Sequence, residues 1–409
     1  MQSQDLIPSL FRTEYSKIVA VLSSYFGLDQ MEMAEDIASE TFLQATENWP
    51  YKGIPENPAA WLYTVAKNKA KNQLHRNHLF QEKISPELKH SEVNAASFEI
   101  DLSPKNISDS QLQMLFAISH PILSEKAQIS LALQILCGFS IDEIADGLLS
   151  TKEAVSKNLQ RAREKLRSER VKLVFPDAID LPGRLNVVLR TLYLLFNEGY
   201  YSESHKDLIR KDLCIEAMNL AYLLLKNKST NTQDTNALMS LMCFQASRLD
   251  ARLSANGELI LYPDQNEELW DTALIEKGFY YLQQASQWKT ASKYYLEASI
   301  AYWHTIKNDT PEKWESIVKL YDLLLQIEDN EIAAMNRIFA LSKAKGKTVA
   351  LAELQSKSFK KNLFYYLLLS DLLLEKDKKA EALEKAMDYA KNDKERQFLE
   401  VKMNALTTS

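Results

Sequence analysis

The sequence predicts an all-α protein. The chain of 409 residues contains only 9 glycines and 11 prolines, the two residue types that are most costly inside a helix. Apolar residues make up 46% and charged residues 25% of the chain, as in ordinary globular proteins. Long runs rich in Leu, Ala, Lys and Glu place apolar residues three and four positions apart, which is the spacing of one helix face. Helix is therefore expected almost throughout.

Changes in composition divide the chain into blocks. Residues 5–80 are expected to form helices around a Pro-rich interruption, NWPYKGIPENP, at 48–58. The segment 81–109 loses the apolar period and is expected to be a linker. A helical block at 110–172 follows. The stretch FPDAIDLPGR at 175–184 then separates it from a long helical region at 185–405.

The last region carries a weak internal repeat. Its segments DNEIAAMNRIFALSKAKGKTVALAEL and KKNLFYYLLLSDLLLEKDKKAEALEKA resemble each other at an offset of about 33 residues. Helix pairs with such a period are typical of tetratricopeptide-like stacking. An irregular helical bundle is the alternative, and we expect the tetratricopeptide-like arrangement.

Two capping boxes predict a helix-turn-helix at 140–167. Ser140 with Glu143 is expected to begin the first helix, and Ser150 with Glu153 the second. Apolar residues at spacings of 4, 3 and 4 form the expected buried stripe of the second helix: Val155, Leu159, Ala162 and Leu166.

The opposite face of this second helix is rich in groups that bind nucleic acid. It is expected to present Lys152, Ser156, Lys157, Gln160, Arg161, Arg163 and Arg167. The first four are expected to face base edges in a major groove, and the three arginines to hold phosphates. A solvated basic face on a core helix is the alternative, but the helix-turn-helix spacing favours DNA binding.

A second basic patch lies in the predicted helix that follows Pro58. Between residues 67 and 78 it contains no acid, and its candidate DNA-binding residues are Trp61, Lys67, Lys69, Lys71 and Arg76. Basic residues next to aromatic ones suit a strand whose bases have left the stack, although tryptophan is more often a core residue. His75 and His78 have helical metal-ligand spacing but no third ligand, so neither a metal nor a cofactor is expected.

Several function classes are disfavoured. No P-loop, HExxH, GxSxG or dinucleotide-binding turn is present, so an enzyme is not expected. Cys137, Cys214 and Cys243 form no CxxC pair and are expected to be buried free thiols in a reducing, cytoplasmic environment. No signal peptide or membrane span is apparent. The formal net charge of −6 disfavours indiscriminate nucleic-acid binding but allows local basic patches.

Three sequence blocks together resemble the extracytoplasmic-function (ECF) group of bacterial RNA polymerase sigma factors. AEDIASETFLQATENWP (34–50) and NPAAWLYTVAKNKAKNQLHR (57–76) look like sigma region 2. LALQILCGFSIDEIADGLLSTKEAVSKNLQRAREKLR (131–167) looks like sigma region 4. Three C-terminal stretches are similar to the ECF subgroup with a tetratricopeptide-like extension: LPGRLNVVLRTLYLLFNEGYYS, KDLCIEAMNLAYLL and GELILYPDQNEELWDTALIEKG.

This resemblance implies a function and partners. The chain is expected to bind RNA polymerase core through Glu35, Asp36, Glu40 and Phe42. The helix after Pro58 would capture the −10 element of promoter DNA, and the helix 151–167 would read the −35 element. The C-terminal domain would modulate activity, and its own ligand or protein partner is left open. The alternative is a helix-turn-helix regulator with a helical sensor domain that acts without polymerase core.

The phrase YLLFNEGY (193–200) is a hallmark of the subgroup that these stretches resemble, and it ends in Asn197-Glu198-Gly199-Tyr200. These last four residues follow the apolar run Leu192–Phe196, so Gly199 is expected to cap the helix in the left-handed conformation or to serve interdomain packing. The alternative is a pocket in which Glu198 and Tyr200 hold a ligand or the sigma domains.

Overall fold

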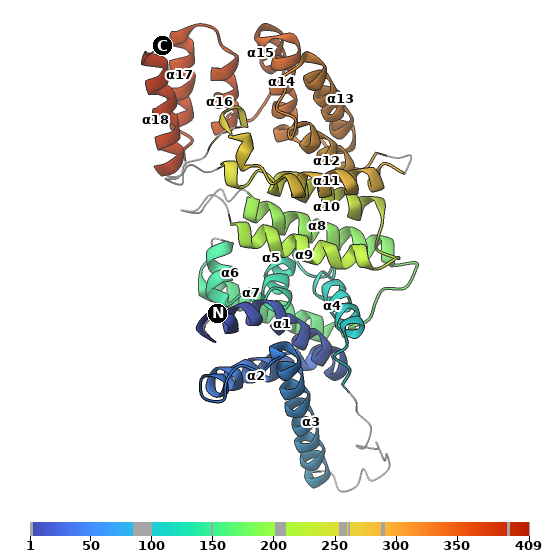
Figure 1. The fold of residues 1–409 in the computed structure, drawn as a ribbon. Coiled ribbons are helices and arrows are strands. Elements are labelled where there is room, and N and C mark those ends of the chain that lie inside the picture. Colours follow the sequence, from blue (N-terminus) through green and yellow to red (C-terminus); the bar gives the residue numbers. More distant parts are fainter. Residues whose placement is uncertain are drawn as a thin grey trace. The chain divides into compact units, whose positions relative to one another are not determined.

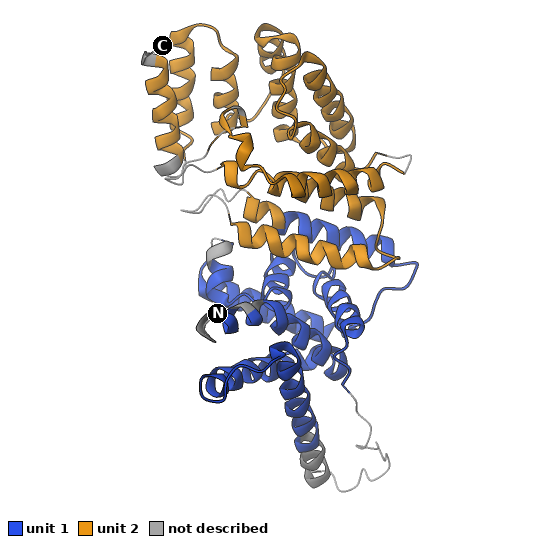
Figure 2. Ribbon diagram, viewed as in Figure 1, with its two compact units in different colours: residues 1–195 blue, residues 196–409 orange. Residues whose placement is uncertain are grey.

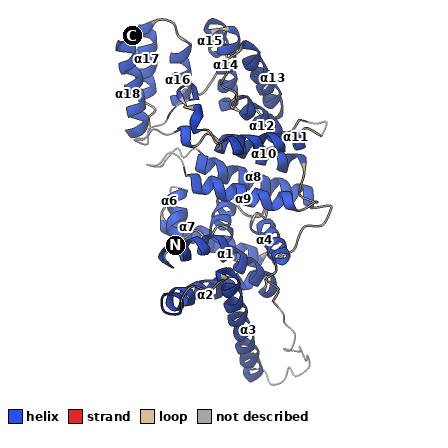
Figure 3. Ribbon diagram, in the orientation of Figure 1, coloured by secondary structure: helices blue, strands red, loops and turns tan. Residues whose placement is uncertain are grey.

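The protein is all-α in the computed structural model, as predicted. The structure describes residues 3–84, 100–148, 150–200, 210–252, 260, 262–287, 291–390 and 393–408. Every regular element within these ranges is a helix, and short loops connect them (Figure 3). No described helix combines the length and the apolarity that crossing a membrane requires.

The chain divides into two compact units, residues 1–195 and 196–409 (Figure 2). The elements of the first unit are α1 (Ser3–Phe26), η1 (Leu28–Gln30), α2 (Met31–Lys52), α3 (Pro58–Ile84), α4 (Pro104–Ile118), α5 (Glu125–Leu131), η2 (Ala132–Leu136), α6 (Ile141–Gly147) and α7 (Lys152–Ser168). The next helix, α8 (Leu181–Tyr200), begins in the first unit and ends in the second.

Helix α1 is the central element of the first unit (Figure 1). Its residues Ile18, Val19, Ala20, Val21 and Leu22 are all fully buried. A helix that is apolar all round must be covered on all sides, and α1 packs against α2, α3, α4 and η2. The predicted blocks at 5–80 and 110–172 therefore pack together around one helix.

Two predicted boundaries need correction. The interruption at 48–58 is shorter than expected because α2 continues through Pro50 to Lys52. Buried Trp49 anchors this last turn, and its carbonyl accepts the N–H of Gly53, which adopts a φ of 82°. The predicted linker 81–109 is also shorter, since α3 runs to Ile84 and α4 begins at Pro104. Residues 85–99 lie outside the described part.

The second unit consists of successive helices with short connections (Figure 1). Its α-helices after α8 are α9 (Lys211–Lys226), α10 (Gln233–Ala246), α11 (Thr272–Ala285), α12 (Lys293–Trp303), α13 (Pro311–Ile327), α14 (Glu331–Lys345), α15 (Lys347–Ser356), α16 (Leu363–Leu372), α17 (Lys376–Met387) and α18 (Asp393–Thr408). Three short 3₁₀ segments lie between α10 and α11: η3 (Asp250–Arg252), η4 (Tyr262–Asp264) and η5 (Glu267–Leu269).

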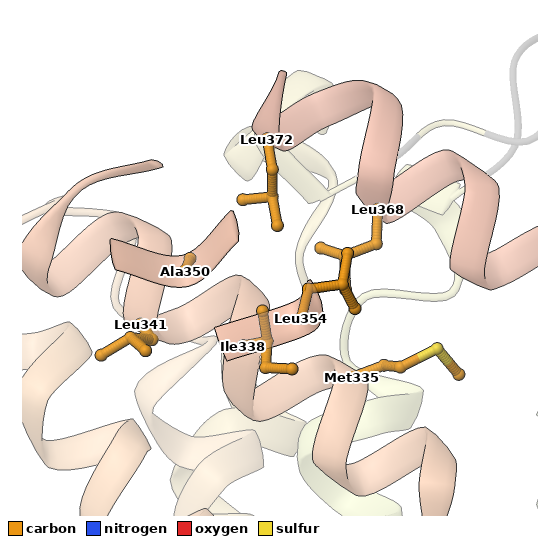
Figure 4. Close-up of a cluster of buried hydrophobic side chains, with 7 residues drawn as sticks. All are labelled: Met335, Ile338, Leu341, Ala350, Leu354, Leu368 and Leu372. Carbon is orange, nitrogen blue, oxygen red and sulfur yellow. The ribbon is translucent and has the colours of Figure 1, made fainter. Parts of the chain in front are cut away.

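Consecutive helices of this unit share apolar clusters. In Figure 4, side chains of α14, α15 and α16 meet in one such cluster. Its members are Met335, Ile338, Leu341, Ala350, Leu354, Leu368 and Leu372. Each helix thus buries its apolar stripe against its sequence neighbours, as helix-repeat folds do. The tetratricopeptide-like classification stays a prediction.

The three cysteines are buried free thiols, as predicted. Burial raises the pKa of both Cys214 and Cys243 to about 12. These two thiols therefore stay protonated at neutral pH and have little nucleophilic character.

Candidate nucleic-acid interface

The first helix of the predicted helix-turn-helix, α6, begins where expected, but the cap of the second helix lies one residue later than predicted. Ser140 and Glu143 form the expected reciprocal capping box, with N–H to side-chain distances of 2.8 and 3.2 Å. The second helix, α7, is capped by Thr151, whose hydroxyl accepts the Ala154 N–H at 3.2 Å. The predicted Ser150 cap is wrong. The Ser150 N–H bonds the Ala145 carbonyl at 2.9 Å and so completes the turn that follows α6.

This difference of one residue is testable. Thr151→Ala should destabilise the first turn of α7 by about 1 kcal/mol, because it removes the cap. Hydrogen exchange of amides in the peptide 152–159 should accelerate by roughly fivefold. Ser150→Ala is the matched control and should leave this exchange unchanged. The reverse pattern would restore the original capping assignment.

The buried stripe of α7 is confirmed. Val155, Leu159, Ala162 and Leu166 are all buried, and α7 packs against α5 and α6. Six residues of the predicted DNA-binding face are exposed: Lys152, Ser156, Lys157, Gln160, Arg161 and Arg167. The face therefore exists as predicted, except at Arg163.

Arg163 lies at the edge of the buried stripe and is engaged inside the first unit, and its contact with phosphate stays a prediction. Its side chain is only 16% exposed. Its guanidinium donates to both carboxylate oxygens of Glu35 in α2, at 2.7 and 2.8 Å, and to Gln134 at 3.1 Å. Because residue 163 is four after Leu159 and three before Leu166, it shares their side of the helix.

Two of the predicted polymerase-binding residues are buried and two are exposed. Glu35 is only 13% exposed, and burial raises the pKa of its carboxyl to about 7, which Arg163 offsets only in part. Phe42 is buried and packs edge-on against Phe11, with ring centroids 5.0 Å apart. Glu35 and Phe42 are thus engaged inside the first unit, and their role in polymerase binding stays a prediction. Asp36 and Glu40 are exposed.

The basic patch on α3 is partly exposed. Lys71 and Arg76 are exposed, whereas Trp61 and Lys67 are half-buried. The Trp61 ring packs edge-on against Trp49, with centroids 5.4 Å apart. The side chain of His78 lies outside the described residues. Within the described part, no cluster of His, Cys, Asp and Glu is arranged to hold a metal ion.

Ion pairs join three residues of the predicted DNA-binding faces to acidic residues of α2. Besides the Glu35–Arg163 pair, Lys69 bonds Glu40 at 2.9 Å. Arg167 lies 3.6 Å from Glu32. Part of the charge assigned to external partners is thus satisfied inside the first unit.

Two exposed cations of the predicted DNA-binding face of α7 remain available. Lys152 pairs with Asp142 of α6 at 2.6 Å. Lys157 and Arg161 are exposed and form no ion pair with any residue in the described ranges. These two side chains are the best placed on α7 to bind a nucleic-acid backbone or base edge.

The Asn197–Tyr200 phrase is not a helix cap. Helix α8 continues through Gly199, which does not adopt a positive φ. A β-carbon at Gly199 would lie 2.6 Å from the Arg210 carbonyl oxygen and 2.9 Å from the Cys214 amide nitrogen. The glycine is therefore required for the close approach of α8 to the start of α9. Its own carbonyl accepts the Arg210 N–H at 2.8 Å.

The neighbours of Gly199 are also engaged within the second unit. The guanidinium of Arg252 lies 3.9 Å from the centre of the Tyr200 ring and donates to the Tyr200 carbonyl at 2.8 Å. Asn197 and Glu198 are half-buried. Packing of α8 against its neighbours accounts for Gly199 and Tyr200 without a ligand.

Sequence reasoning missed the Glu35–Arg163 pair. Arg163 could have been found, since it lies at helical spacing from two stripe residues, Leu159 and Leu166. Its partner could not, because Glu35 is separated from it by 128 positions and belongs to a different predicted domain.

Comparison with known proteins identifies two segments of the chain. Residues 10–79 match the family Sigma-70 region 2, and residues 184–286 match a family of unknown function, DUF6596. An uncharacterized protein of Rhizobium meliloti (strain 1021), R00370, is 30% identical over 397 residues, which cover 95% of this chain and 93% of that protein. No solved structure matches.

The sigma-70 region 2 match covers α2 and most of α1 and α3, the elements that carry the acidic and basic groups described above. This region gives a sigma factor its role in promoter recognition by RNA polymerase. The chain therefore contains a sigma-70 region 2 segment at residues 10–79, and it belongs with the Rhizobium protein, with which it shares nearly its whole length.

Proposed function

We propose that the chain is an ECF-type sigma factor in which α7 reads the −35 promoter element. The observation that carries the proposal is the face of α7, where Lys157 and Arg161 are exposed and free of ion pairs with described residues. A capped helix of this diameter suits a major groove, and such cations bind phosphates and guanine edges. The same compact unit contains the sigma-70 region 2 segment.

The first unit then divides its contacts between two partners. On α3, Lys71 and Arg76 are exposed and supply cations for the backbone of the opened −10 strand. On α2, Asp36 and Glu40 provide exposed carboxylates for a basic surface of RNA polymerase core. The second unit is proposed to modulate this activity, which is supported by its attachment to the first unit through α8.

Transcription with purified core polymerase tests the assignment of α7. Lys157→Ala should lower open-complex formation at a cognate promoter by roughly tenfold, the cost of one lost base or phosphate contact. Binding to core polymerase should stay unchanged. Lys126→Ala, at an exposed lysine of α5 outside the proposed face, is the matched control. An equal loss of core binding in Lys157→Ala would contradict the assignment.

The rival reading, a regulator that acts without polymerase, predicts a different result. It requires the chain alone to bind a duplex promoter specifically. The sigma-factor proposal requires core polymerase for selective binding. Gel-shift titrations with and without core separate the two, and specific binding of equal strength in both would support the rival.

A further inference from the structure

A buried group of cationic and aromatic side chains lies in the second unit and includes none of the residues assigned above. We call it the basic–aromatic cluster. It consists of Arg248, Tyr262, Trp270, His304, Lys313 and Trp314. Arg248 and Trp270 are 7% exposed, Trp314 is 3% exposed and Lys313 is 2% exposed. Burial of this degree is unusual for a lysine and an arginine.

Tyr262 is the centre of the cluster. Its ring centroid lies 5.0 Å from that of His304 and 6.4 Å from that of Trp270. Arg248 and Lys313 approach the same ring at 5.6 and 5.3 Å. The Lys313 ammonium also donates to the Tyr262 hydroxyl at 3.0 Å. Contacts of cations with an aromatic ring offset only part of the cost of burying two charges.

Four buried polar atoms in and beside the cluster have no hydrogen-bond partner among the residues that the structure describes. They are Arg248 Nε, Trp270 Nε1, His304 Nδ1 and Gln265 Oε1. Native proteins satisfy nearly all such atoms, so several together call for an explanation. Two of the four are obligatory donors, the guanidinium nitrogen and the indole nitrogen, and donors of this kind require an acceptor.

The charges of the cluster are compensated only in part, by Asp309 and Glu267 near Lys313. Two partly buried arginines elsewhere pair with carboxylates: Arg337 bonds Asp322 and Glu353, and Arg163 bonds Glu35. Arg248 forms no ion pair with a residue in the described ranges. The nearby Asp309 accepts from Trp314 Nε1 and lies 3.7 Å from Lys343.

Burial and the neighbouring positive charges lower the pKa values of two groups in the cluster, His304 and Lys313. Burial, followed by the charges of Arg248 and Lys313, lowers the pKa of His304 to about 3, so its imidazole is neutral. Burial also lowers the pKa of Lys313, and Asp309 offsets only part of this effect. A negative charge bound next to His304 and Lys313 would raise the pKa values of both groups.

We propose that the basic–aromatic cluster binds the oxyanion group of a small molecule, a phosphate or a carboxylate. Arg248 supplies planar donors that suit such a group, the Trp270 indole N–H supplies another, and Lys313 supplies a second positive charge. The surrounding aromatic rings keep the local dielectric low and strengthen each contact. The site does not depend on the sigma-factor proposal and is testable without polymerase or DNA.

The test uses the full chain, with tryptophan fluorescence and thermal unfolding as readouts. Inorganic phosphate and acetate are titrated separately against chloride at matched ionic strength, which distinguishes the two oxyanion types. We expect a saturable fluorescence change with one of them. At an anion concentration of about one hundred times the Kd, the melting temperature of the second unit should rise by roughly 5 °C or more.

Variants locate the response. Arg248→Met should abolish the saturable change and should melt no lower than the wild-type chain without anion, because it removes an uncompensated buried charge. Trp270→Phe removes only the indole N–H and should weaken binding while preserving the fold. Arg337→Met is the matched control, since it breaks an arginine–carboxylate pair; it should melt lower but keep the anion response.

Two results would overturn the proposal. One is the absence of a saturable response to either anion in the wild-type chain. The other is a response that survives in Arg248→Met and Trp270→Phe, which would place the bound anion elsewhere, such as on the exposed cations of α3 and α7.

Discussion

Arg163→Glu is expected to destabilise the packing of α7 against α2 by roughly 3–5 kcal/mol, the usual cost of breaking a buried ion pair. The substitution places two carboxylates together where burial already raises the pKa of Glu35 to about 7. Hydrogen exchange of the amides in α2 and α7 should accelerate by about a hundredfold or more. Exchange in the second unit should not change.

The reversed pair is the control for this prediction. Combining Glu35→Arg with Arg163→Glu should recover most of the lost protection, because the charges again oppose each other. Arg167→Glu alters the more exposed contact with Glu32 and should have little effect on exchange. The side chain of Arg167 is 46% exposed and that of Glu32 is 61% exposed. Failure of the reversed pair to recover protection would mean that packing at Arg163, rather than its charge, holds the two helices together.

A substitution in the Glu35–Arg163 ion pair also tests whether Arg163 acts in stability or in DNA recognition. If Arg163 is engaged with Glu35, Arg163→Gln should change exchange protection but leave discrimination at the −35 element intact. The same promoter assay used for Lys157→Ala measures this. Relaxed −35 selectivity in Arg163→Gln would return Arg163 to the DNA-binding face.

Gly199→Ala is expected to destabilise the second unit by roughly 2–4 kcal/mol through overpacking. The added methyl would lie 2.6 and 2.9 Å from backbone atoms of Arg210 and Cys214, which cannot rotate away as a flexible side chain could. Chemical unfolding followed by circular dichroism should show an earlier transition, and hydrogen exchange of α9 should accelerate.

Gly183 provides a matched control in the same helix. No atom lies within 4 Å of a β-carbon built there. Gly183→Ala should therefore be neutral or slightly stabilising, because alanine favours helix over glycine by up to about 1 kcal/mol. Equal destabilisation by both substitutions would show that helix propensity or expression, and not the close approach of α9, dominates at Gly199.

Local features of the chain were predictable from local rules. The α7 stripe and the Ser140–Glu143 capping box follow from spacing alone, since each involves residues within one or two helical turns. The second cap was displaced by one residue because Ser150 and Thr151 are both good caps, and the preceding turn uses the Ser150 N–H. The Pro-rich stretch predicts a break at Pro50, but α2 continues to Lys52 because buried Trp49 and the hydrogen bond from Gly53 to its carbonyl hold the last turn.

Charges were harder to interpret than apolar residues. An acid or base in the sequence can bind an external partner or an internal one, and the residue type is the same in both cases. Arg163, Glu35, Lys69 and Glu40 all have internal partners here. Lys157 and Arg161 differ from them only in what the fold places nearby.

Local rules fix the all-α class, the order of the helices and the positions of the capped helices α6 and α7, because helix period and capping act over a few residues. Tertiary structure decided which charged groups are paired, why Gly199 is required and that Arg248, Tyr262 and Lys313 come together. These depend on contacts between residues far apart in the chain, and no local pattern encodes a distance between two helices.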